Sequence, residues 1–219
     1  MSEGTHNPIS EEAFYRKKFF LSLIIPGILV FFMWLTRIIE LLFEIDLVHL
    51  GIYPLTLKGL PGILFSPFIH EDFRHLFNNS LPVLMLSVAL FYFYSEIAFR
   101  IFSLTYILTG VLVWLGGRGA WHIGASGLVY GLASFLFFSG IIRKYYRLTA
   151  LSLLIVFIYG EMVWGLFPGI YENISWESHM LGFVSGIFLA LLYRNEGPQR
   201  PVYDWMEEEE EEEVVSGER

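Results

Sequence analysis

Long apolar runs separated by short polar stretches dominate the pattern of this chain. Six of these runs hold few or no charged residues, and each has a length within the roughly 17 to 25 residues that cross a bilayer as a helix. They span residues 19–36, 76–95, 101–117, 119–142, 148–167 and 176–193. This spacing predicts an all-α membrane protein, a bundle of six transmembrane helices.

Lysine and arginine are unevenly divided between the two sets of connections. Nine stand before the first run, after the last run, or in the second and fourth connections, against four on the opposite side. The richer side of a membrane protein faces the cytoplasm. We therefore expect an integral, multi-pass protein with both termini cytoplasmic, and its simple architecture suits a bacterial cytoplasmic (inner) membrane.

The runs and their flanks divide the chain into three parts. We predict a cytoplasmic N-terminal segment (1–18), a six-helix core (19–194) and a disordered, acidic cytoplasmic tail (195–219). Seven consecutive glutamates, Glu207–Glu213, account for most of the net charge of −8. The first external loop, about 39–73, is apolar but broken by glycine and proline, which predicts short helices partly embedded in the outer leaflet.

Composition agrees with lipid as the solvent. The chain is 55% hydrophobic and 16% charged, whereas soluble domains have about 45–50% apolar and about 25% charged residues. Outside the acidic tail the charge is close to neutral, which argues against a nucleic-acid partner, since such a partner requires a basic surface. The chain has no cysteine, so a thiolate nucleophile and disulfides are excluded.

Four polar residues stand out near the outer ends of the apolar runs: His75, Asn79, Ser126 and His179. Polar and ionisable groups at membrane depth are costly and are functional candidates by default. His75 and Asn79 are four residues apart and share one helix face. The second, fourth and sixth runs are expected to be parallel, which places His75, Ser126 and His179 at a similar depth.

Acyl transfer is the chemistry that fits these residues. The Ser126 hydroxyl needs a base to become a nucleophile, and His179 can accept its proton. His75, Asn79 and the backbone amide of Ser126 are candidate donors to an oxyanion. We predict a Ser–His dyad and not a triad. Tyr130, one turn after Ser126, is placed to pack on the imidazole.

Small residues surround the same positions. Gly124 and Gly127 flank Ser126 and allow a substrate or backbone to approach closely. Gly182 and Gly186 follow His179 as a small-xxx-small stripe, which favours tight packing against another helix.

These motifs resemble those of the rhomboid intramembrane proteases. The resemblance extends over about 19–193. It rests on four motifs: GxSG (Gly124, Ser126 and Gly127), HxxxN in the second run (His75 and Asn79), a histidine before GxxxG in the sixth run (His179, Gly182 and Gly186), and a tyrosine one turn after the serine (Tyr130). It implies a rhomboid-like bundle and a Ser–His dyad that hydrolyses peptide bonds in or near transmembrane segments of membrane-protein substrates. It implies no metal and no cofactor. The first external loop lacks the Trp-Arg pair that many members carry.

Other interpretations remain open at this stage. A catalytically inactive rhomboid-like binding or quality-control protein typically lacks the serine or the histidine, and a small transporter would spread its polar residues along a pathway. His70-Glu71 begins like a zinc-binding HExxH motif, but His75 follows His70 by five residues, about 140° around a helix. Glu161 is either a gate element near the site or a residue near a loop that reaches outer water.

Overall fold

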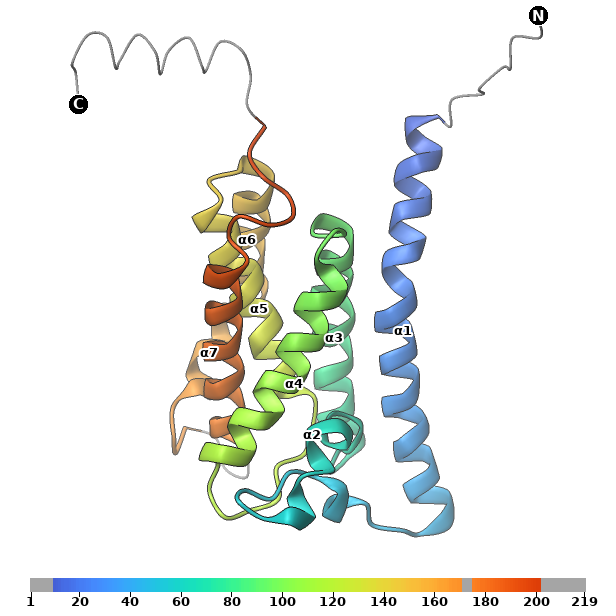
Figure 1. Cartoon of the computed structure of the whole chain (residues 1–219). Helices are drawn as coiled ribbons and strands as arrows, with labels where there is room; N and C mark the ends of the chain where they lie inside the picture. Colours follow the sequence, from blue (N-terminus) through green and yellow to red (C-terminus); the bar gives the residue numbers. More distant parts are fainter. Residues whose placement is uncertain (1–9, 171–174, 202–219) are drawn as a thin grey trace, which may run out of the picture.

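The computed structural model describes residues 10–170 and 175–201. Within these residues the structure is helical, and the one β contact is an isolated bridge between Ile52 and His122. The long helices are α1 (Glu11–Phe43), α3 (Phe73–Phe93), α4 (Ala98–Gly116), α5 (Ser126–Ile142), α6 (Tyr146–Tyr159) and α7 (Trp176–Leu192). The described chain begins and ends at the same end of the bundle (Figure 1).

Four helical segments are long and apolar enough to cross a membrane. They are α1, α3, α4 and the segment Tyr146–Leu166, in which α6 continues into the 3₁₀ helix η4 (Gly160–Leu166). The helices α5 and α7 are apolar but have 17 residues each, about 25 Å of helix against a hydrocarbon core of about 30 Å. The chain is an integral membrane protein with four candidate spans, and the count of six stays a prediction.

Several helix bounds differ from the sequence-based ones. The fourth helix begins at Ser126, not at residue 119, because 117–125 forms an irregular segment in which Gly124 has a φ of 95°. That left-handed conformation is incompatible with a helix and suits glycine. The first helix begins earlier than predicted, at Glu11, because the side chain of Ser10 caps it.

The segment between α1 and α3, predicted to be the first external loop, contains four short helical segments, which confirms the prediction of short helices there. They are η1 (Val48–Leu50), η2 (Leu57–Gly59), α2 (Gly62–Phe65) and η3 (Ser66–Phe68). The loop pairs with segment 117–125, since Ile52 and His122 exchange two backbone hydrogen bonds of 2.9 and 2.8 Å. The amide of Gly124 donates to the carbonyl of Ser66 at 2.9 Å. The loop therefore supports the backbone that leads into Ser126.

A cation between two aromatic rings adds a second anchor for this loop. The Lys58 Nζ lies 4.4 Å from the centre of the Tyr53 ring and 5.4 Å from that of Trp121. The two rings meet edge to face at 5.0 Å. Such a contact contributes about 1 kcal/mol. This loop has no Trp-Arg pair, and the contact of Lys58 with Tyr53 and Trp121 connects it to the segment before α5.

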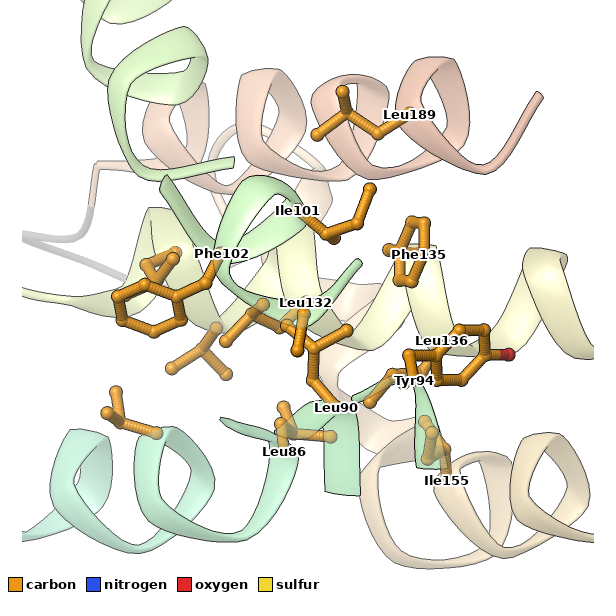
Figure 2. Close-up of a cluster of buried hydrophobic side chains, with 14 of the residues drawn as sticks. Leu86, Leu90, Tyr94, Ile101, Phe102, Leu132, Phe135, Leu136, Ile155 and Leu189 are labelled. Carbon is orange, nitrogen blue, oxygen red and sulfur yellow. The ribbon is translucent and has the colours of Figure 1, made fainter. Parts of the chain in front are cut away.

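The bundle core gathers around α5, which contacts α3, α4, α6 and α7. Figure 2 shows large side chains from these five helices meeting in one cluster, with Tyr94 at the C-terminal end of α3 packed edge to face on Phe135 of α5. Leu90, Leu132 and Phe135 are fully buried. The helix α1 lies at the side of the bundle and packs along α3 (Figure 1).

Helices α5 and α7 approach so closely that glycine is required at their contact. A Cβ on Gly182 would lie 2.1 Å from the carbonyl oxygen of Gly127, and one on Gly186 would lie 2.1 Å from that of Gly131. Real Cβ atoms essentially never come within 3.0 Å of another heavy atom. The small-residue stripe therefore brings together the two helices that carry Ser126 and His179.

The chain beyond α7 folds back on the bundle at the end away from Ser126 and His179. The guanidinium of Arg143 donates to the carbonyls of Tyr193 and Pro198 at 2.6 and 3.0 Å, and Arg100 forms a 3.0 Å ion pair with Glu196. The first residues of the predicted tail are thus packed against the core. The glutamate run Glu207–Glu213 lies outside the described residues.

Candidate active site

Three candidate site residues lie in the first turns of three different helices. His75 is the third residue of α3, Ser126 is the first of α5 and His179 is the fourth of α7. Asp72 caps α3 by accepting a 2.6 Å hydrogen bond from the His75 amide, and Ser175 caps α7. These two caps fix where α3 and α7 begin, and so where His75 and His179 project, whereas α5 has no side-chain cap.

The hydroxyl of Ser126 and the imidazole of His179 are hydrogen-bonded. The distance from Ser126 Oγ to His179 Nε2 is 2.9 Å. The other ring nitrogen, Nδ1, lies 2.9 Å from the carbonyl oxygen of Gly165 in η4. Since a carbonyl only accepts, Nδ1 must carry the proton and Nε2 is left with its lone pair toward the serine. This is the arrangement in which a base can activate a hydroxyl nucleophile.

Tyr130 completes the packing of the imidazole. Its ring stacks on His179 with centroids 4.2 Å apart and planes inclined by 12°. Its hydroxyl donates to the carbonyl of Met162 in η4 at 2.6 Å. His179 is therefore held between a ring on α5 and a backbone carbonyl on η4, with no carboxylate as its direct partner among the described residues.

The candidate oxyanion donors adjoin the serine motif. A Cβ on Gly124 would lie 2.9 Å from the imidazole Nε2 of His75 and 3.8 Å from the amide nitrogen of Asn79. Glycine at this position thus leaves room for both side chains. Asn79 Nδ2 donates to the backbone carbonyl of His75 at 3.1 Å, which orients the amide. The Ser126 amide, as the first in α5, has no carbonyl partner within its helix.

These groups line one cavity of about 730 Å³. Its wall includes all five sequence-predicted polar and aromatic residues (His75, Asn79, Ser126, Tyr130 and His179). Charged side chains also line it, among them Glu71, Arg74 and Arg118. The hydrogen-bonded serine and histidine therefore share one cavity with charged side chains.

His70 and Glu161, two further candidates from the sequence, lie outside the hydrogen-bonded pair of Ser126 and His179. The His70 ring is buried and meets the His75 ring edge to face at 5.0 Å. Burial lowers the pKa of His70 to about 3, so the ring is neutral at physiological pH. Glu161 is exposed in η4, beyond the end of α6.

A polar network beside the site was missed by sequence reasoning. The carboxylate of Glu177, two residues before His179, forms an ion pair with Arg118, and His122 is hydrogen-bonded to Ser175. An acidic residue in the first turn of an apolar helix is itself a signal of a special role. The orienting carbonyl of Gly165 has no such signal, because every residue has a carbonyl.

Comparison with known proteins identifies the family. Residues 59–196 match the Rhomboid domain. Uncharacterized proteins of Mycobacterium tuberculosis and Mycobacterium bovis are each 32% identical to this chain over 160 residues, 65% of this chain and 62% of theirs. An uncharacterized protein of Mycobacterium leprae is 30% identical over 169 residues, which cover 73% of this chain and 66% of its own length.

The chain belongs to the rhomboid family, whose members are generally intramembrane serine proteases. It spans about 62% of the length of the tuberculosis and bovis relatives.

Proposed function

We propose that this protein is an intramembrane serine endopeptidase that hydrolyses peptide bonds in or near the transmembrane segments of membrane proteins. The observation that carries the proposal is the 2.9 Å hydrogen bond from Ser126 to His179, with the opposite ring nitrogen held by Gly165. Membership of the rhomboid family supports the same reaction class.

In the proposed reaction, the Ser126 oxygen attacks the scissile carbonyl carbon while His179 Nε2 takes the hydroxyl proton. The negative charge on the former carbonyl oxygen is stabilised by His75, Asn79 and the Ser126 amide. Collapse expels the amine, which receives the proton from His179. Water then attacks the acyl-enzyme, giving its proton to the same nitrogen, and releases the acid product with Ser126 restored.

We also propose six membrane spans, with α5 and α7 completing the four long helices and both termini in the cytoplasm of a bacterium. The exposed apolar side chains of the first external loop, including Leu55 and Leu57, suit a loop partly embedded in the outer leaflet. Substrates would then reach the cavity from the bilayer and the outer side.

The test is cleavage of a tagged single-span membrane protein by the purified full chain in liposomes. Wild type should release a defined product, and Ser126→Ala and His179→Ala should each lower the rate by at least about 10³-fold. Ser103→Ala and His49→Ala are matched controls, since Ser103 lies within α4 and His49 is exposed in η1.

A fluorophosphonate probe gives a second measurement, because it should label wild type at Ser126 and leave the Ser126→Ala variant unlabelled. Equal product from wild type and Ser126→Ala would refute the proposal. No cleavage and no labelling of wild type would instead indicate an inactive rhomboid-like protein.

A further inference from the structure

Two contacts join the segment before the nucleophile to the start of the helix that carries the base. Segment 117–125 contains no α-helical residue and leads directly into Ser126. Residues 175–178 include the cap and first turn of α7 and lead directly into His179. We call the two contacts together the loop–helix clamp, formed by Arg118, His122, Ser175 and Glu177.

The first contact is ionic. Arg118 Nη1 lies 3.3 Å from both carboxylate oxygens of Glu177. Glu177 is only 6% exposed, and a buried carboxylate is stable only when it is paired and hydrogen-bonded. Its place in the first turn of α7 is also favourable, because the free amides there attract negative charge. Removal of the charge should weaken the attachment of Arg118 to α7.

The second contact runs through His122, which is 2% exposed. Its Nε2 lies 3.0 Å from the carbonyl of Arg118, so Nε2 donates and Nδ1 accepts. The hydroxyl of Ser175 then donates to Nδ1 at 2.5 Å, and Ser178 donates to Ser175 at 2.7 Å. A continuous chain of hydrogen bonds therefore connects the backbone of segment 117–125 to the cap of α7.

The clamp acts at the end of α5 and α7 where Ser126 and His179 lie. The hydrogen bond from the Ser134 hydroxyl to the Phe183 carbonyl, at 2.9 Å, also joins these helices, but about two turns further along α5. The glycine contact of Gly127 with Gly182 fixes how closely α5 and α7 pack, but packing alone permits one helix to slide or rotate against the other. The hydrogen bond between Ser126 and His179 tolerates only a few tenths of an ångström of such motion. The clamp ties together the two segments that lead into these side chains.

We propose that Glu177 and His122 are positioning residues that hold Ser126 and His179 in register by tying segment 117–125 to the start of α7. The proposal rests on the proposed protease function, which it deepens. Neither residue bonds to Ser126 or His179, so neither is assigned a chemical role.

The experiment combines kinetics with a distance measurement in the full chain. Glu177→Gln and His122→Gln should each lower kcat by about 10- to 100-fold with less than about a threefold change in KM, because misplacement of reacting groups impairs the chemical step more than binding. Glu177→Asp should recover part of the loss. The double variant Arg118→Gln/Glu177→Gln should lose no more than the worse single variant, as expected for residues that act through one contact.

The distance measurement does not depend on activity. The chain has no cysteine, so a variant with Gly119→Cys and Val184→Cys carries spin labels at these two positions only. Gly119 lies in segment 117–125, and Val184 is exposed on α7. At Gly119 a Cβ meets nothing closer than 3.8 Å. The distance distribution should be narrow in the otherwise unchanged protein and broad with Glu177→Gln.

The matched control is Glu196→Gln, which removes the Arg100 ion pair at the opposite end of the bundle and should leave kcat and the distribution unchanged. A wild-type kcat in both Glu177→Gln and His122→Gln, or a narrow distribution with Glu177→Gln, would overturn the inference. If wild type cleaves no substrate, the proposed function fails, while the spin-label distribution still decides whether the clamp exists.

Discussion

The contact between Gly182 and Gly127 gives the sharpest test of how packing supports the site. Gly182→Ala places a Cβ 2.1 Å from the Gly127 carbonyl oxygen, so α5 and α7 must separate by more than about 1 Å to bring the two atoms to an ordinary contact distance of at least 3.4 Å. Ser126 is next to Gly127, and His179 lies one turn before Gly182. The same separation would stretch their 2.9 Å hydrogen bond beyond its useful range.

Two magnitudes follow from this displacement. Overpacking of a tight interface typically costs about 1–3 kcal/mol of unfolding free energy. A displacement of about 1 Å between reacting groups costs about 100-fold in rate. We therefore expect Gly182→Ala to lower the unfolding temperature and to reduce cleavage about 100-fold, measured by thermal unfolding in detergent and by the liposome assay.

Gly27→Ala is the matched control. Gly27 lies within α1, and a Cβ there meets no atom within 4 Å, so alanine should leave cleavage unchanged and stabilise the helix by up to about 1 kcal/mol. If Gly182→Ala cleaves at the wild-type rate and unfolds at the wild-type temperature, the steric reasoning is wrong.

Three further predictions test separate contacts. Tyr130→Phe keeps the ring stack but removes the bond to Met162, so unfolding free energy should fall by about 1 kcal/mol and cleavage several-fold; an unchanged unfolding curve would contradict this. The hydrogen bond from the His75 amide holds the pKa of the Asp72 carboxyl below its usual range in the folded protein. The ionised carboxylate therefore stabilises the fold above the pKa that Asp72 has in the unfolded chain, and this stabilisation is lost as the pH falls through its pKa in the folded protein. Asp72→Asn should make the unfolding temperature depend less on pH on the acid side of a profile of unfolding temperature against pH. Lys58→Met removes the cation between the two rings and should speed proteolytic nicking of the first external loop.

The contact between Ser126 and His179 could be predicted from the sequence because its signal is local. A histidine, a serine and a second histidine in otherwise apolar runs stand out by chemistry alone, and the parallel order of alternate runs places them at one depth. The structure has them in the first turns of α3, α5 and α7, with Ser126 and His179 in contact.

Apolarity was a poor guide to helix ends. Residues 119–125 are apolar enough to read as part of a span, but Trp121 packs on Tyr53 and His122 pairs with Ile52, so their burial comes from the first external loop. Hydropathy indicates that a residue is buried from water, but it does not indicate whether lipid or another part of the chain buries it. The Glu177 ion pair was missed for a related reason, since its partner Arg118 is 59 residues away in the chain.

The orientation of His179 by the carbonyl of Gly165 has a consequence for mutagenesis. A side-chain partner can be deleted by alanine, but a main-chain oxygen stays whatever residue stands at 165. No substitution at 165 therefore removes the acceptor of the Nδ1 proton of His179. Even Gly165→Ala would act through shape and not through loss of the carbonyl, because its Cβ would lie 2.1 Å from the Tyr130 hydroxyl and 3.0 Å from Nδ1 of His179.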